Sequence, residues 1–263
     1  HKGIYHIVFD HIKRPYNFID TETLQDLEKL IAVVEDGNYK GVVFSSSKSS
    51  FIVGANIKIF VTAHDAEKKV VEGFLKEGQD LFNRIEDLDI PSVAIMNGIT
   101  MGGGLELALA CTSRVLIENV GEKDEYTVVP RTRIGLPEVK LGILPSWGGT
   151  TRLPRIINPT KAMELICSGR DVGSREALKI GIVDCIQSSN KALDAACGII
   201  EGIDHKTISN SKRVVPNVSR LKMGVAGWLT KWLIGRKQKK MFGDKNKYCL
   251  LYTSDAADDL TRV

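Results

Sequence analysis

The sequence predicts an α/β domain followed by a helical extension, and three observations support this fold class. Short runs of alternating or continuous apolar residues, typical of strands, are separated by stretches with apolar residues at helical spacing. From about residue 190 onwards only helical patterns remain. The chain has 263 residues, of which 43% are hydrophobic, so it can bury the core of one domain with an appendage.

Four elements are expected in the first part of the chain. Residues 4–9 alternate β-branched, aromatic and polar side chains and predict a strand. Asp20 is a favourable start for a helix, whose apolar face is Leu24, Leu27, Leu30, Ile31 and Val34. Residues 41–44 predict a second, buried strand. A helix is expected at about residues 65–86, with an apolar face of Val70, Phe74, Leu81 and Ile85.

The later elements are shorter. Further strands are predicted at residues 92–96, 115–117 and 182–186. Further helices are predicted at residues 105–110, 192–203 and 221–233. Trp228 and Trp232 lie four residues apart on one face of the last helix, which indicates a packing surface rather than a cofactor site.

Composition narrows the functional classes. The net charge of +4 is mild and gives no reason to expect a nucleic-acid partner. Basic residues crowd residues 231–247, where a solvated helix face or linker is favoured over an anion-binding patch. The five cysteines lack C-x-x-C spacing, which argues against a disulfide framework or a zinc site and suits a reducing compartment. No apolar run is long enough for an integral membrane segment.

Both ends of the chain carry separate expectations. The chain starts at His1 and enters a strand pattern almost at once, so we expect an incomplete N-terminus. A cytoplasmic location is expected, and the incomplete N-terminus keeps an organellar matrix as the alternative. Residues 249–263 break from the basic sequence before them and resemble the translation of a sequencing adapter. The predicted division is a main domain at 1–189, a helical extension or linker at 190–248 and a non-native tail at 249–263.

Two glutamates stand out as candidates for acid–base chemistry. Glu106 lies in an apolar run, where a carboxylate is costly unless it is functional or paired. An ion pair with an arginine such as Arg114 is the structural alternative. Glu138 follows Pro137, and for this residue a helix N-cap role is the alternative. Two carboxyl groups can serve as base and acid where their surroundings separate their protonation states.

Glycine-rich turns accompany these glutamates. Three consecutive glycines at 102–104 can bring backbone N–H groups close to a ligand, although tight helix packing also selects glycine. Their spacing is neither that of a dinucleotide-binding fingerprint nor that of a P-loop. Residues 51–58 predict a second, strand-to-helix turn at Gly54 and Ala55 that would direct free N–H groups outward, with an ordinary loop as the alternative. The histidines lie outside all these motifs, so a Ser-His-Asp arrangement or a histidine metal site lacks support.

In combination, these motifs resemble the enoyl-CoA hydratase/isomerase (crotonase) superfamily. The resemblance runs from about Gly3 to Ile186. It rests on F-x-x-G-A-[DN]-I-K at 51–58, N-G-x-x-x-G-G-G-x-E at 97–106, L-P-E-x-x-L-G-x-x-P at 136–145 and the glycine-rich segment 148–155. It implies a crotonase (ClpP-like) fold, an α/β superhelix of repeated ββα units with a C-terminal helical extension.

The resemblance also implies a role for each motif. Ala55 and Gly103 would supply the two N–H groups of an oxyanion hole for a thioester oxygen. Glu106 would take a proton from water, and Glu138 would deliver a proton to C2. Lys58 would contact the CoA moiety, with a solvated lysine as the alternative. The other expected substrate-binding residues are Gly54, Gly102 and Trp147.

The implied reaction is hydration of trans-2-enoyl-CoA in fatty-acid β-oxidation, with an accompanying 3-enoyl to 2-enoyl isomerase activity. The alternatives are a pure enoyl-CoA isomerase and a non-catalytic assembly module. Within the superfamily the chain looks most like the N-terminal domain of multifunctional fatty-acid oxidation α-subunits, truncated before the dehydrogenase domain. That resemblance implies a homo-oligomer or a complex with thiolase. It implies no metal and no cofactor in this fragment, because acyl-CoA is the substrate and NAD belongs to the following domain.

Two features depart from the family pattern. Asn56 stands where Asp is usual, and Asn caps helices comparably well. The spacing from Glu106 to Glu138 is longer than usual by about one surface loop. The conformation of the segment between the two glutamates is therefore the least predictable part of the site.

Overall fold

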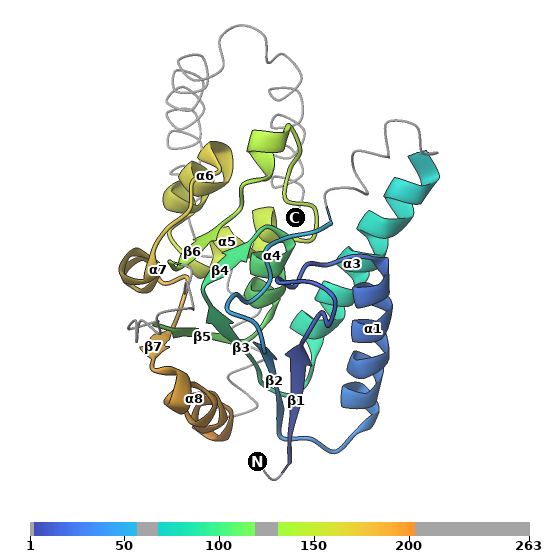
Figure 1. The fold of residues 1–263 in the computed structure, drawn as a ribbon, viewed down its shortest axis with the longest axis vertical. Helices are drawn as coiled ribbons and strands as arrows, with labels where there is room; N and C mark the ends of the chain where they lie inside the picture. The colour runs from blue at the N-terminus through green and yellow to red at the C-terminus, as the bar shows by residue number, and fades with distance from the viewer. Residues whose placement is uncertain (1–2, 57–67, 119–130, 203–263) are drawn as a thin grey trace, which may run out of the picture.

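The computed structural model describes residues 3–56, 68–118 and 131–202 and contains two parallel sheets (Figure 1). The larger sheet has the order β1-β2-β3-β5-β7. Its strands are β1 (Ile4–Phe9), β2 (Gly41–Ser46), β3 (Ser92–Asn97), β5 (Ser113–Ile117) and β7 (Cys185–Gln187). The smaller sheet pairs β4 (Ile99–Met101) with β6 (Arg133–Gly135). The α/β fold class is thereby confirmed.

The large sheet is covered by helices on both faces, as parallel sheets require (Figure 1). Successive side chains of β2 and β3 alternate between two cores, because strand side chains point to opposite faces. Phe44 and Met96 join the core under α1 (Thr21–Asp36), α3 (Lys68–Asp87) and α4 (Gly103–Ala110). Val43 and Ile95 join the core under α8 (Ser189–Gly202), which contributes Ala192, Ala196 and Ile200.

The repeated ββα arrangement is visible in the middle of the chain. β3, β4 and α4 follow one another, with β3 in the large sheet and β4 in the small sheet. β5 and β6 divide between the sheets in the same way. β6 is followed by the 3-10 helix η1 (Glu138–Leu141) and by α5 (Gly149–Ile156). As a result, α4 and η1 both begin where the short strands of the small sheet end.

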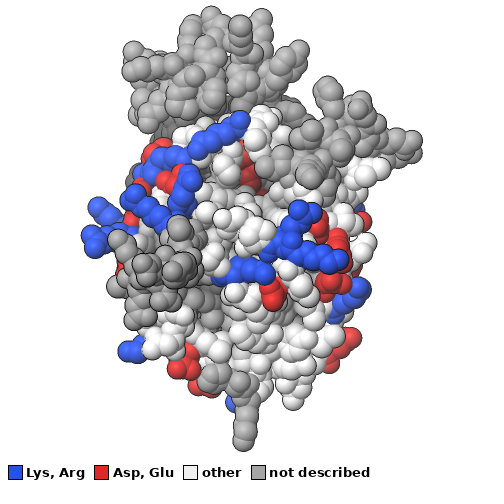
Figure 2. Space-filling model, in the orientation of Figure 1, with Lys and Arg blue, Asp and Glu red and all other residues white. Residues whose placement is uncertain are grey.

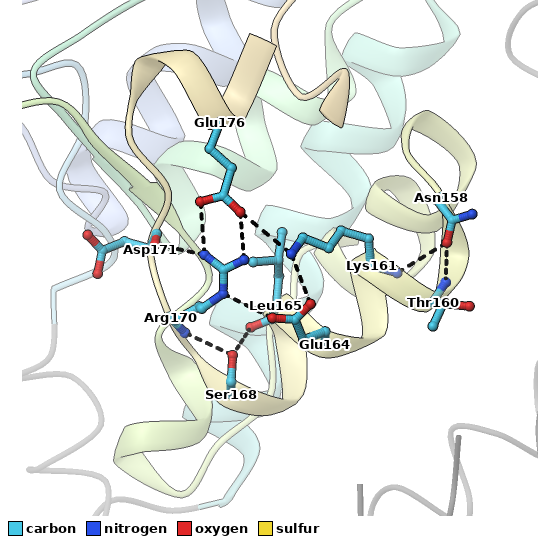
Figure 3. A network of polar contacts seen from close by, with 9 residues as sticks. All are labelled: Asn158, Thr160, Lys161, Glu164, Leu165, Ser168, Arg170, Asp171 and Glu176. Atoms are coloured by element: carbon cyan, nitrogen blue, oxygen red, sulfur yellow. Dashed lines mark hydrogen bonds and ion pairs between the residues drawn. The ribbon is translucent and has the colours of Figure 1, made fainter. Parts of the chain in front are cut away.

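A polar network fixes the segment that runs beside β6 (Figure 3). Arg170 lies between α6 (Pro159–Ser168) and α7 (Ser174–Ile180) and donates to Glu176 at 2.7 and 3.1 Å and to Glu164 at 3.1 Å. The next residues pair with the small sheet, because Val172 exchanges backbone hydrogen bonds with Ile134 of β6. The network therefore anchors the chain against the strand that leads to η1.

Most expected elements are present with shifted ends. Asp20 caps α1 by accepting from the Thr23 N–H at 2.9 Å. The strand predicted at 182–186 is wrong in its first half, because Ile182 donates to the Ala177 carbonyl and closes the end of α7. β7 starts only at Cys185. Several predictions concern residues that the structure does not describe. These are Lys58, the start of the helix predicted at 65–86, and the helix predicted at 221–233 with Trp228 and Trp232.

The surface of the described residues carries charges of both signs. Figure 2 shows Lys and Arg side chains beside Asp and Glu side chains on one face of the molecule. Ion pairs on the surface of the described residues include Arg84 with Glu35 at 2.6 Å and Arg133 with Asp171 at 2.8 Å. Among the helices within the described ranges, none is both long and apolar enough to cross a bilayer.

Candidate active site

Two glycine turns from distant parts of the chain lie against each other. Gly54 has a φ of +132° and Gly102 a φ of +51°, which are values that L side chains rarely adopt. A Cβ on Gly102 would lie 3.7 Å from the Gly54 Cα and 2.9 Å from Glu138 Oε1. The Met101 N–H donates to the Ile52 carbonyl at 3.1 Å and holds the two turns together. Glycine is therefore required where the two turns and a carboxyl group converge.

Two backbone N–H groups of these turns, both in residues that line one cavity, are left without an acceptor among the described residues. Asn56 N–H donates to the Ile19 carbonyl at 2.8 Å, and Gly102 N–H donates to the Gly135 carbonyl at 3.0 Å. Ala55 precedes Asn56, and Gly103 follows Gly102. The N–H groups of Ala55 and Gly103 have no acceptor within the described part of the chain. Gly103 is the first residue of α4, so its N–H is one that the helix itself cannot satisfy. Both residues line the same cavity.

Glu106 lies one turn along α4 and is held by backbone donors. Its side chain is 2% exposed, and Oε1 accepts from the N–H groups of Trp147 and Gly149, both at 2.8 Å. Burial raises the pKa of Glu106 from 4.5 to about 7, against the opposing effects of these two donors and of Arg152. The alternative ion pair with Arg114 is wrong. Arg114 instead contacts Asp184 and the carbonyls of Cys111 and Ile182.

Glu138 is the first residue of η1 and faces the same cavity. It is 9% exposed, and its Oε2 is buried without a hydrogen-bond partner among the described residues. Burial raises the pKa of Glu138 from 4.5 to about 8, with a further contribution from the charge of Glu106. The N-cap alternative is wrong, because Pro137 occupies that position and no side chain caps η1.

The cavity is small and mostly apolar, at about 90 Å³. Both carboxyl groups and both glycine turns line it, together with Val53, Leu75, Pro137, Leu141, Ile143, Leu144, Ser146 and Trp147. Trp147 is 2% exposed and packs edge-on against Phe74 and Phe82, with ring centroids at 5.2 and 5.5 Å. The fold thus brings together every predicted site residue except Lys58, which lies outside the described residues.

A larger hollow of about 690 Å³ lies elsewhere, between the end of α1, the loop to β2 and the end of α3. Its arginine, Arg84, is occupied by Glu35 at 2.6 Å and Glu28 at 3.4 Å. Neither Glu106 nor Glu138 lines this hollow, and neither do the turns at Gly54 and Gly102. Size alone does not make this hollow the reactive site. Within the described ranges, no cluster of three His, Cys, Asp or Glu side chains could hold a metal ion.

The sequence motifs do not reveal how the Glu106 carboxyl group is oriented. The Trp147 and Gly149 donors lie 41 and 43 residues further along the chain. A third residue, Arg152, donates to the Trp147 carbonyl at 2.6 Å. The run of glycines at 148–149 signals a tight turn, but only the folded chain places this turn over Glu106.

The buried carboxyl groups make stability depend on pH. Their raised pKa values mean that the folded protein retains protons which the unfolded chain releases above about pH 4.5. The free energy of unfolding is therefore expected to fall as the pH rises from about 4.5 to about 8. For Glu106 alone, the change from 4.5 to about 7 corresponds to about 3 kcal/mol.

Urea unfolding of the wild type and the Glu106→Gln variant at about pH 5 and about pH 8.5 checks this expectation. The difference in the free energy of unfolding, variant minus wild type, should be more positive at about pH 8.5 than at about pH 5. Glu77→Gln, at an exposed position of α3, is the matched control and should show the wild-type pH dependence. Parallel pH dependence of Glu106→Gln and the wild type would contradict the burial cost assigned to Glu106.

Comparisons with known proteins place these features in a wider group. A family model described as enoyl-CoA hydratase/isomerase matches residues 1–221. A crystal structure of an enoyl-CoA hydratase from Bacillus anthracis is similar, with 24% identity, a TM-score of 0.68, and coverage of 98% of this chain and 93% of that chain. An enoyl-CoA hydratase from Thermoplasma volcanium is similar with 24% identity and a TM-score of 0.69, over 96% of this chain and 93% of that chain. An enoyl-CoA hydratase from Geobacillus kaustophilus is similar with 25% identity and a TM-score of 0.68, over 95% of this chain and 91% of that chain.

Proposed function

The chain belongs to the enoyl-CoA hydratase/isomerase family, and from this premise we propose that it adds water to trans-2-enoyl-CoA to give 3-hydroxyacyl-CoA. One observation carries the proposal: a single, mostly apolar cavity is lined by two buried carboxyl groups and by two residues whose N–H groups have no acceptor in the described part of the chain. Hydration of an enoyl thioester needs a base, an acid and donors to the carbonyl oxygen. The cavity contains one candidate set for all three.

The N–H groups of Ala55 and Gly103 would bind the thioester oxygen. As water adds to C3, negative charge moves onto this oxygen and an enolate forms. Donors that are already aimed at the oxygen stabilise that charge without reorganisation, and one such donor is typically worth about 2.7–4 kcal/mol. The position of Gly103 at the start of α4 adds the favourable end of the helix dipole.

The two glutamates would then carry the proton transfers. Glu106, held as a carboxylate by two N–H donors, takes one proton from water while the water oxygen bonds to C3. Glu138, whose carboxyl group is protonated up to a higher pH, delivers its proton to C2 as the enolate collapses. One water is consumed, and proton transfer between the two carboxyl groups through solvent restores the starting state.

An enoyl-CoA isomerase is the nearest rival. Isomerisation needs one group that moves a proton between C4 and C2, whereas both Glu106 and Glu138 face this cavity. We therefore expect hydration to dominate, with 3-enoyl to 2-enoyl isomerisation as a side activity through the same enolate. Comparing rates on 2-enoyl and 3-enoyl thioesters distinguishes the two. A faster reaction of the 3-enoyl thioester would favour the isomerase.

The wider role is part of the same proposal. Hydration of 2-enoyl-CoA suits fatty-acid β-oxidation, in which the 3-hydroxyacyl product is oxidised next. A non-catalytic module that docks a thiolase is the other alternative, and its supporting residues Trp228 and Trp232 lie outside the described residues. A purified protein that binds a partner and turns over no enoyl thioester would favour that alternative.

The reaction is expected to have a bell-shaped pH dependence. Activity requires Glu106 to be ionised and Glu138 to be protonated, so kcat/KM should fall below about pH 7 and again above about pH 8. Because the two groups interact, both limbs report the pair rather than one residue each. Initial rates of crotonyl-CoA hydration from about pH 5.5 to about pH 9.5 measure the profile. A rate that still rises at the alkaline end of this range would contradict a protonated Glu138 as the acid.

A further inference from the structure

We propose that Arg152 is a positioning residue that sets the location of the Glu106 carboxylate by holding the turn at residues 147–149. The inference rests on the proposed function, because it assigns a role in the same proton transfer. Arg152 is not among the residues that line the cavity. It acts through the backbone that Glu106 contacts.

One residue of the turn connects the two side chains. The Trp147 N–H donates to Glu106 Oε1 at 2.8 Å, and the carbonyl of the same residue accepts from Arg152 Nη1 at 2.6 Å. The Gly149 N–H adds a second bond to Glu106 Oε1 at 2.8 Å. Rotation of the peptide groups at Trp147 would therefore break the bond from Arg152 and, at the same time, displace the N–H groups that donate to Glu106.

The other side of the guanidinium is fixed to α3. Arg152 is 2% exposed, and it donates from Nε to Glu86 Oε2 and from Nη2 to Asn83 Oδ1, both at 2.7 Å. All three guanidinium nitrogens are therefore bonded, two to a neighbouring helix and one to the turn. This forked geometry is specific to arginine and cannot be reproduced by lysine.

The shape of the turn matches this arrangement. Gly148 has a φ of +102°, and a Cβ at that position would collide with the guanidinium of Arg152. A Cβ on Gly149 would lie 3.1 Å from Glu106 Oε1. The turn is therefore packed between the arginine on one side and the carboxylate on the other, with glycine at the two points of closest approach.

The positive charge of Arg152 also acts on the ionisation of Glu106. Among the described residues, the charged groups that act on Glu106 are Glu138 from η1 and Arg152 from α5, and Arg152 favours the ionised form. Arg152 is itself balanced by Glu86, which Arg155 also approaches at 3.7 Å. Removing the cation of Arg152 should thus displace the carboxylate and make its ionisation less favourable.

Two variants test the proposal. Arg152→Lys keeps the charge and loses the fork, and Arg152→Met combined with Glu86→Gln removes the charge without leaving Glu86 unpaired. Each is expected to lower kcat for crotonyl-CoA hydration by about a hundredfold, the effect of a small misplacement of a catalytic group, with KM changed less than about threefold. In the double variant the acidic limb of the pH profile should also move to higher pH.

Arg155→Met is the matched control, because Arg155 lies on the same helix and approaches the same Glu86, whereas the hydrogen bond to the Trp147 carbonyl comes from Arg152. Its kcat and acidic limb should equal those of the wild type. Asn83→Ala leaves Arg152 in place and removes one bond from α3, so a drop in kcat of a few fold is expected even if the Arg152 variants do not fold.

A readout independent of turnover separates this inference from the proposed function. Titration of the Glu106 carboxyl carbon by nuclear magnetic resonance, assigned with Glu106→Gln, measures its pKa whether or not crotonyl-CoA is hydrated. A higher pKa in the charge-removed double variant and an unchanged pKa in Arg155→Met support the positioning role. An unchanged pKa together with wild-type kcat, or a loss of thermal stability without either change, would overturn it.

Discussion

Replacement of Glu106 by glutamine is expected to lower the rate of crotonyl-CoA hydration by about 10²–10⁴-fold, the usual contribution of a positioned acid or base. The amide oxygen of the introduced glutamine can still accept the N–H groups of Trp147 and Gly149, so the local structure should persist. The amide cannot take a proton from water. Glu138→Gln should have a loss of similar size, because the amide has no acidic proton for C2.

Binding should survive in both variants, since the N–H groups of Ala55 and Gly103 and the apolar cavity walls are untouched. Steady-state rates and direct titration with a saturated acyl-CoA measure the two properties separately. Glu77→Gln, on the exposed face of α3, should hydrate crotonyl-CoA at the wild-type rate. The double variant should be little worse than either single one, because residues that act as a unit are not additive. Near-normal hydration by either single variant would refute these roles.

Gly104→Ala is expected to have the largest effect on folding. A Cβ at this position would collide with the backbone carbonyl and Cβ of Ile52, which is fully buried. Neither partner can move aside as a flexible side chain could. We expect a loss of at least about 1–3 kcal/mol in the free energy of unfolding, the usual cost of overpacking a core.

The same collision should reach the chemistry. Ile52 precedes the turn that carries the Ala55 N–H, and Gly104 follows the residue that carries the second N–H. Pushing these segments apart would separate the two donors, so hydration should fall even where the variant remains folded. Gly198→Ala is the control, because a Cβ there meets nothing within 4 Å, and it should raise stability by about 0.5–1 kcal/mol. Equal stability of the two variants would contradict the close packing at Gly104.

The fold is largely predictable because its signals are local. The Asp20 cap and the apolar stripe of α1 need only adjacent residues, and both are present. The buried strands β2 and β3 are marked by continuous apolar runs. The strand predicted from residue 182 fails because Ile182 and Val183 are apolar for another reason. They close α7 and fill the core, and their backbone bonds go to the helix.

The residues of the candidate site are predictable from the sequence, but the contacts that orient the Glu106 carboxyl group are not. Resemblance to a family singles out Ala55, Gly103, Glu106 and Glu138, which the fold brings to one cavity. No local pattern could show that Arg152 contacts α3, since Glu86 lies 66 residues away in the sequence. The choice of Arg114 as a partner for Glu106 fails for the same reason. Proximity in sequence does not decide which buried charges meet.

The most direct test of the central claim is the product formed from crotonyl-CoA in D2O, analysed by nuclear magnetic resonance and mass spectrometry. Water addition at C3 with Glu106 as the base and protonation at C2 by Glu138 predict 3-hydroxybutyryl-CoA with one deuterium on C2. Neither Glu106→Gln nor Glu138→Gln should form this product at a comparable rate. Deuterium exchange into the carbon chain without oxygen at C3, or recovery of unchanged crotonyl-CoA, would contradict the account.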